Sequence, residues 1–141
     1  MTKVDLGSSE VHLTLPADDK KLRELVAFLE ADMNAHHILP KKQFNVISAA
    51  EEIFVNISNY AYENAGKVDI TTYVQGDTYY VRFSDAGKEY NPLEHQDPDI
   101  TLKLKDRPIG GLGIFIAKKL SDEISYAYEN NKNVLILGFS L

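Results

Sequence analysis

The chain has 141 residues, 44% hydrophobic and 26% charged, which is the composition of a soluble globular protein with one compact core. Its formal net charge of −6 disfavours a polyanion such as DNA as a direct partner. It has no cysteine, which excludes disulfides and thiolate metal sites, and it shows neither a signal peptide nor an apolar run of roughly 18 residues, so we expect a cytoplasmic protein without membrane contact.

The first part of the chain predicts a strand followed by two helices. Residues 10–16 alternate apolar and polar side chains, which is the period of a half-buried strand. Residues 17–38 carry apolar side chains at helical spacing. A second, longer helix is predicted to begin near Pro40 and to end by Gly66, because glycine is a common helix terminator.

The remainder predicts two hairpins separated by a long loop and a short helix. Residues 67–85 form two β-rich runs around the turn "QGD", and residues 123–141 form two more around "NNK". Residues 86–111 hold three of the five prolines and much of the charge, and a loop of this length is usually a functional lid or disordered. The helix predicted over 112–122 opens just after a group of glycines.

These elements follow one another in the order β-α-α-β-β-loop-α-β-β. Because the strands come in hairpins, we expect a mixed, mostly antiparallel sheet, covered on one face by about three helices. The predicted fold class is therefore α+β, a two-layer α/β sandwich, with residues 1–141 forming a single domain.

The long helix carries a polar stripe whose middle consists of Ser48, Glu52, Asn56 and Asn59. The ordinary interpretation is the solvated face of an amphipathic helix. However, asparagine is a poor residue for a helix interior, and its carbonyl oxygen is a good ligand for a hard cation. A glutamate one turn earlier is placed to accept a proton. On local pattern alone, both interpretations stay open.

The segment "FSDAGKEYNP" also has two interpretations. Aspartate and glycine are common residues where a strand ends in a turn, so the first interpretation is purely structural. Alternatively, the carboxylate of Asp85 at the strand end accepts a hydrogen bond from an exocyclic amine such as that of adenine. Gly87 would then allow a ligand to approach the backbone closely.

The segment "RPIGGLGIFIAKKL" places Gly110, Gly111 and Gly113 at the start of an apolar helix. Free amides at a helix N-terminus, next to glycines, form an anion site, and Arg107 just upstream could reach the same phosphates. The pattern is neither a Walker A loop nor a dinucleotide fingerprint. A flexible hinge is the alternative interpretation.

The order of these motifs is more specific than any one of them. A Glu-x-x-x-Asn helix, an Asp-x-Gly strand end, a long loop and a glycine-rich helix start follow one another within residues 52–113. This order resembles the GHKL (Bergerat-fold) ATP-binding family, and within it the anti-sigma-factor serine/threonine kinases. The resemblance covers nearly the whole chain. A sensor histidine kinase, a gyrase or an Hsp90-type chaperone would be expected to bring further domains.

The resemblance implies a role for each motif residue. Glu52 would be the catalytic general base, Asn56 the Mg²⁺ ligand, and Asp85 the adenine-binding carboxylate with Gly87 beneath the base. ATP and Mg²⁺ would be the cofactors. The other nucleotide-binding residues implied by the resemblance are Tyr90, Arg107, Gly110, Gly111 and Gly113, and the ATP lid would span residues 88–109.

The resemblance also implies partners. The chain would phosphorylate a serine or threonine on a STAS-domain anti-anti-sigma factor and would sequester a sigma factor through the first helix of a homodimer. One departure from the family pattern is Tyr60, where relatives often carry histidine. Two alternatives remain, namely a nucleotide-gated binding module of the same fold without phosphoryl transfer, and an α+β interaction domain that binds no nucleotide.

Overall fold

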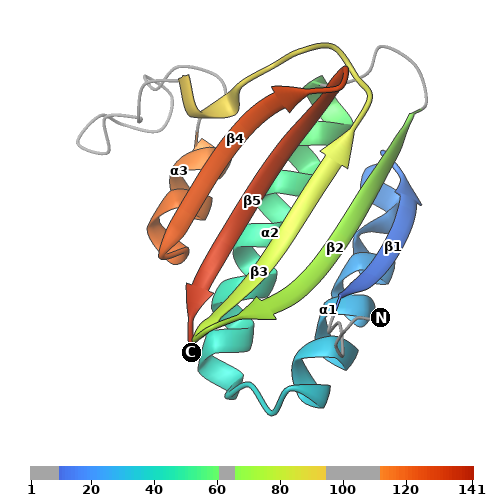
Figure 1. Ribbon diagram of the computed structural model, residues 1–141. Helices are drawn as coiled ribbons and strands as arrows, with labels where there is room; N and C mark the ends of the chain where they lie inside the picture. The colour runs from blue at the N-terminus through green and yellow to red at the C-terminus, as the bar shows by residue number, and fades with distance from the viewer. Residues whose placement is uncertain (1–9, 61–65, 95–111) are drawn as a thin grey trace, which may run out of the picture.

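The computed structural model describes residues 10–60, 66–94 and 112–141, and it confirms the predicted order of elements (Figure 1). The helices and strands are β1 Val11–Pro16, η1 Asp19–Lys21, α1 Leu22–Ala35, α2 Pro40–Tyr60, β2 Lys67–Gln75, β3 Thr78–Asp85, η2 Pro92–Glu94, α3 Leu112–Leu120, β4 Glu123–Glu129 and β5 Lys132–Ser140. No helix in the described ranges is both long enough and apolar enough to cross a membrane.

The five strands form one sheet in the order β1-β2-β3-β5-β4, and each pairing in it is antiparallel. Both predicted hairpins are confirmed. Gly76 takes a left-handed φ of 61° in the first turn. Asn130 and Asn131 take φ values of 54° and 61° in the second, which is the backbone that a two-residue type I′ turn requires. The pairing of β3 with β5, which are not joined by a hairpin, places Asp85, the last residue of β3, directly beside Asn133 on β5.

All three α-helices cover the same face of the sheet, which makes the predicted two-layer α+β sandwich (Figure 1). The core lies between the two layers, because alternate strand positions point toward the helices. The largest fully buried side chains are Tyr79, Phe54, Phe83, Phe139, Leu25, Leu29, Met33, Ile53, Ile70, Leu137, Val46 and Val68.

The turn between α1 and α2 is fixed by backbone hydrogen bonds at the end of α1. His37 takes a left-handed φ of 56° and donates its N–H to the carbonyl of Asn34 at 3.0 Å. The next amide, that of Ile38, donates to the carbonyl of Met33 at 3.0 Å, and the Ile38 side chain is buried. This is a Schellman ending, and Pro40 then supplies a favourable first residue for α2.

One buried polar cluster ties α1 to the sheet. Asp32 on α1 is buried, and its Oδ2 accepts hydrogen bonds from the hydroxyls of Thr72 at 2.8 Å and Tyr79 at 2.6 Å. His36 Nε2 lies 3.8 Å from the other oxygen, Oδ1. Burial, together with the hydrogen bond to Asp32, raises the pKa of Tyr79 far above its ordinary value, so this hydroxyl is a permanent donor. The cluster satisfies a buried carboxylate that would otherwise be costly.

We predict that Tyr79→Phe lowers the free energy of unfolding by about 1–3 kcal/mol, because it leaves the buried carboxylate of Asp32 without one of its donors. Urea unfolding of the purified chain measures this loss. Tyr80→Phe is the matched control, since its hydroxyl contacts only the exposed Glu123 at 3.3–3.5 Å and its removal should cost little. Equal losses for the two variants would show that the buried cluster contributes no more to the free energy of unfolding than an exposed hydroxyl does.

Candidate functional site

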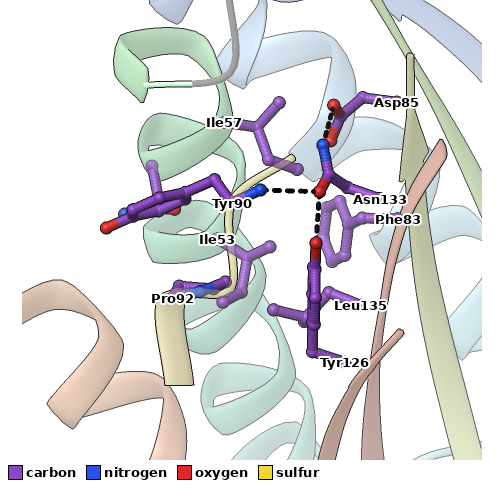
Figure 2. Close-up of a pocket in the computed structure, with 10 residues that line it drawn as sticks. Ile53, Ile57, Phe83, Asp85, Tyr90, Pro92, Tyr126, Asn133 and Leu135 are labelled. Atoms are coloured by element: carbon purple, nitrogen blue, oxygen red, sulfur yellow. Dashed lines mark hydrogen bonds between the residues drawn. The ribbon is translucent and has the colours of Figure 1, made fainter. Parts of the chain in front are cut away.

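A cavity lies where the C-terminal end of β3, the first half of β5 and the C-terminal half of α2 meet (Figure 2). The segment 86–94, which follows β3, contributes to its rim. The residues that line the cavity are Ile53, Asn56 and Ile57 from α2, Phe83 and Asp85 from β3, Tyr90 and Pro92 from the segment 86–94, Tyr126 from β4, and Asn133 and Leu135 from β5. Three of the motif residues predicted from the sequence therefore meet at one place.

Asp85 is held in a defined orientation although it is only 4% exposed. Its Oδ1 accepts the backbone N–H of Gly87 at 2.9 Å, as in an Asx turn, and the side-chain amide of Asn133 at 3.0 Å. Its Oδ2 has no donor among the described residues. Burial raises the pKa of Asp85, while the hydrogen bonds from Asn133 and Gly87 act in the opposite direction. One oxygen of a buried, oriented carboxylate thus remains available for an incoming N–H donor.

Asn133 connects Asp85 to the segment that follows β3 (Figure 2). Its Nδ2 donates to Asp85 and, at 2.9 Å, to the carbonyl of Lys88. Its Oδ1 accepts the backbone N–H of Tyr90 at 3.0 Å and the hydroxyl of Tyr126 at 2.5 Å. This side chain is 5% exposed, and it fixes both the carboxylate and the backbone of residues 88–90.

The cavity is small, about 20 Å³, which is room for about one water molecule. Most of its lining belongs to α2 and the sheet, whose backbones are tied into helix and ladder hydrogen bonds. Tyr90 and Pro92 belong instead to the segment 86–94. A planar ring the size of a purine is larger than this enclosed space, so we expect the rim at Tyr90 and Pro92 to move outward when such a ring binds.

Glu52 and Asn56 lie on the side of α2 that α3 approaches. Both side chains are partly buried, so this part of the polar stripe is not an open solvated face. The Glu52 carboxylate reaches Gly113, the second residue of α3, so closely that a Cβ at Gly113 would lie 2.6 Å from Glu52 Oε1. Burial, and to a lesser extent the charge of Glu51, raises the pKa of Glu52. Neither Glu52 nor Asn56 has a side-chain hydrogen-bond partner within the described residues.

The site residues predicted from the sequence fall into two groups. Those within the described residues are Glu52, Asn56, Asp85, Gly87, Tyr90 and Gly113. Those outside them are Arg107, Gly110, Gly111 and residues 95–109 of the predicted lid. The predicted start of the third helix is confirmed, because α3 begins at Leu112 and contains Gly113, and it ends at Leu120, two residues before the predicted end. The roles assigned to all these residues stay predictions.

Sequence reasoning missed Asn133 and Tyr126. Asn133 stands in a turn-rich stretch, "ENNKNV", in which asparagine is expected for conformational reasons. The signal that identifies it is the strand register, which becomes visible only when β3 and β5 are paired. In the part of the chain that the structure describes, no three His, Cys, Asp or Glu side chains gather as a metal site. Asn56 is the polar side chain that α2 contributes to the lining of the cavity.

Comparison with protein families gives a direct result. Residues 15–139 match the family described as the histidine kinase-like ATPase domain. The chain belongs to this family. Because the match spans both the Asp85 site and α2, the cavity lies within the ATPase domain. A search of the curated proteins found no match.

The fold of this histidine kinase-like ATPase domain also occurs in a solved structure from Mycobacterium tuberculosis. That structure is described as the RsbU and RsbW domains of Rv1364c. The similarity has a TM-score of 0.68 at 16% sequence identity, and it covers 94% of this chain but only 32% of the other chain. At this level of identity the similarity shows the shared α+β fold.

We predict that Asn133→Asp destabilises this ATPase domain by about 1–3 kcal/mol at pH 7, because it replaces the donor to Asp85 with a carboxylate oxygen. The loss should shrink as the pH falls, because one member of a buried carboxylate pair takes up a proton more readily than an isolated aspartate does. Urea unfolding at several pH values measures it. Asn131→Asp, in the exposed turn nearby, is the matched control and should show little change. A similar loss for both variants would argue against a stabilising role for the hydrogen bond from Asn133 to Asp85.

A second prediction follows from the raised pKa of Glu52. Because the folded state favours the protonated carboxyl, this group's contribution to stability is present below its unfolded pKa and is lost as pH rises through the folded pKa. Glu52→Gln should therefore stabilise the chain at pH 7–8, by less than about 1 kcal/mol for a partly exposed group, and the gain should vanish near pH 4. Unfolding curves at both pH values test this, with the exposed Glu30→Gln as control. A gain independent of pH would refute it.

Proposed function

We propose that this chain binds ATP with Mg²⁺ and transfers the terminal phosphoryl group to a serine or threonine of a protein substrate. The observation that carries the proposal is the state of Asp85. It is buried, it lines the cavity, two donors fix its Oδ1, and its Oδ2 lacks a donor in the described part of the chain. The exocyclic amine of adenine is the kind of donor that this oxygen fits, whereas the carbonyl that guanine carries at the same ring position is not.

The rest of the cavity is compatible with a purine. The side chains of Ile53, Ile57, Phe83 and Leu135 offer an apolar surface to the ring faces. Membership in the histidine kinase-like ATPase family supports the same ligand. In this proposal Gly87 leaves room beneath the base, and Tyr90 borders the entrance that has to open.

The residues on α2 fit the phosphate end of the nucleotide. Asn56 lines the same cavity as Asp85, and its side-chain carbonyl has no partner among the described residues. Asn56 would hold Mg²⁺, and the bound cation would supply positive charge close to the phosphates during transfer. The first-turn amides of α3, which an α-helix leaves without intrahelical partners, would complete the proposed phosphate site together with Arg107, Gly110 and Gly111.

Glu52 is the proposed general base. Its carboxylate stands one helical turn before Asn56, it has no hydrogen-bond donor among the described residues, and its pKa is raised by burial. A carboxylate in this state binds a proton more readily than a solvated one does. Glu52 would therefore orient the substrate hydroxyl and accept its proton as the oxygen attacks.

We propose that the substrate is a STAS-domain anti-anti-sigma factor and that the chain also sequesters a sigma factor as a homodimer in the cytoplasm. The order of motifs in the sequence, which resembles the anti-sigma-factor kinases, supports this choice. The outer surface of α1, including Arg23, Glu24 and Glu30, is exposed and therefore accessible to another chain.

A nucleotide-gated module without phosphoryl transfer is the second candidate function. The observation that favours it is Tyr60, which stands where relatives often carry histidine.

Two measurements test this function. Calorimetry with Mg-ATP should show binding by the wild type and a loss of about 10–100-fold in affinity for Asp85→Asn, because one acceptor of a charged hydrogen bond is replaced by an amide. Asp69→Asn, at an exposed position on β2, is the matched control. With a STAS-domain protein present, the wild type should form phosphoserine or phosphothreonine, and Glu52→Gln should bind ATP normally but transfer about 100-fold more slowly or worse.

The outcomes separate the three hypotheses. Binding without transfer to the cognate STAS protein, under conditions where a known kinase is active, would leave the nucleotide-gated module. Absence of Mg-ATP binding, with Asp85→Asn indistinguishable from the wild type, would leave an interaction domain that binds no nucleotide.

A further inference from the structure

The start of α3 lies against the side chain of Glu52. An ideal Cβ built on Gly113 would lie 2.6 Å from Oε1, 3.6 Å from Cδ and 3.7 Å from Cβ of Glu52. All three of these nearest atoms belong to the same side chain. Two heavy atoms do not approach to 2.6 Å without a hydrogen bond, so the Glu52 carboxylate occupies space that exists only because residue 113 has no side chain.

The backbone does not explain why this residue is glycine. Among the described glycines, Gly76 is the one with a left-handed φ, and Gly113 lies inside the helix α3. Within a helix, alanine is more favourable than glycine by roughly 1 kcal/mol. Secondary structure alone would therefore favour alanine at this position, so the glycine is explained by what lies beside it.

We propose that Gly113 is a positioning residue for Glu52, whose missing side chain forms the seat for the Glu52 carboxylate. This goes beyond the role that the resemblance implies for Gly113, which is to offer a backbone amide to phosphate. It rests on the proposed function only in that Glu52 is the base whose position is being set.

The contact predicts a specific response to alanine. The closest atom is the far end of a flexible side chain, so Glu52 can rotate away and α3 can stay folded. The carboxylate then leaves the partly buried place against α3 and becomes better solvated. The Asp85 end of the cavity is formed by β3, β5 and the segment after β3, and it does not change. Substrate binding and proton transfer are thereby separated.

A double-mutant cycle tests the proposal. Phosphoryl transfer to the STAS-domain protein and the KM for ATP are measured for the wild type, Gly113→Ala, Glu52→Gln and the double variant. Gly113→Ala should lower kcat by about tenfold or more while leaving the KM for ATP within about twofold. The double variant should be no slower than Glu52→Gln alone, because the two changes remove the same function. A tenfold rise in the KM for ATP in both backgrounds would show instead that Gly113 serves the phosphates, and it would overturn the proposal.

A second readout does not depend on kinase activity. The side-chain carboxyl carbon of Glu52 is titrated by NMR in the free protein, without ATP or Mg²⁺, in the wild type and in Gly113→Ala. The midpoint in Gly113→Ala should move down toward that of an ordinary glutamate, because the carboxylate gains solvent, while the nearby Glu51 is the same in both proteins. An unchanged midpoint would overturn the proposal.

The two readouts keep the inference and the proposed function apart. If Glu52→Gln transfers phosphate normally, the role of Glu52 as base fails, while the NMR midpoint still decides whether Gly113 seats it. Gly76→Ala is the control for general loss of stability, since this glycine has open space around it but a left-handed φ. It should lower the melting temperature and leave phosphoryl transfer at the wild-type rate.

Discussion

The side-chain amide of Asn133 uses both of its donor hydrogens and both of its acceptor positions. Its partners come from the end of β3, from the segment 88–90 and from β4. A buried amide satisfied in this way has one orientation, since rotating it by half a turn would bring donors against donors. The orientation of the Asp85 carboxylate, and the course of the chain that leaves β3, both depend on this arrangement. The remaining features of the site are built around a fixed carboxylate.

The surroundings of the polar stripe on α2 are set by α3, which packs against it. A stripe of Asn, Ser and Glu on an isolated amphipathic helix would face water. In the folded chain α3 lies along α2, so Glu52 is partly buried beside Gly113 while Asn56 faces the cavity that contains Asp85. The same helix thus supplies core residues on one side and, on the other, two polar groups in different surroundings. The carboxyl group of Glu52 therefore lies against α3, while the amide of Asn56 lines the cavity.

Much of the fold follows from local pattern. The alternation in residues 10–16, the helical spacing before and after Pro40, and the turns at Gly76 and Asn130 depend on neighbours within a few positions, so the sequence is sufficient to predict them. The meeting of Asp85 with α2 was also predictable, but only because the motifs follow one another in the order of a known family.

The features that were missed depend on contacts between distant segments. Asn133 becomes important because the register pairs it with Asp85, and a shift of one residue would turn its side chain to the other face of the sheet. The buried Asp32 looks like an ordinary helix residue until Thr72 and Tyr79 are placed beneath it. Neither the register between β3 and β5 nor the placement of α1 on the sheet is encoded in the composition of a short stretch, so neither contact was visible in the sequence.

The small volume of the cavity bears on how fast a ligand enters as well as on how tightly it binds. If a purine binds only to molecules in which the rim at Tyr90 and Pro92 has moved outward, the apparent dissociation constant is the intrinsic one divided by the fraction of open molecules. At high ligand concentration the observed rate of association would then level off at the rate of opening. Asn133 anchors that rim through the amide of Tyr90 and also orients Asp85. The side chain of Asn133 therefore couples how precisely a ligand is recognised to how fast it enters, because tighter anchoring of the rim would improve the first and slow the second.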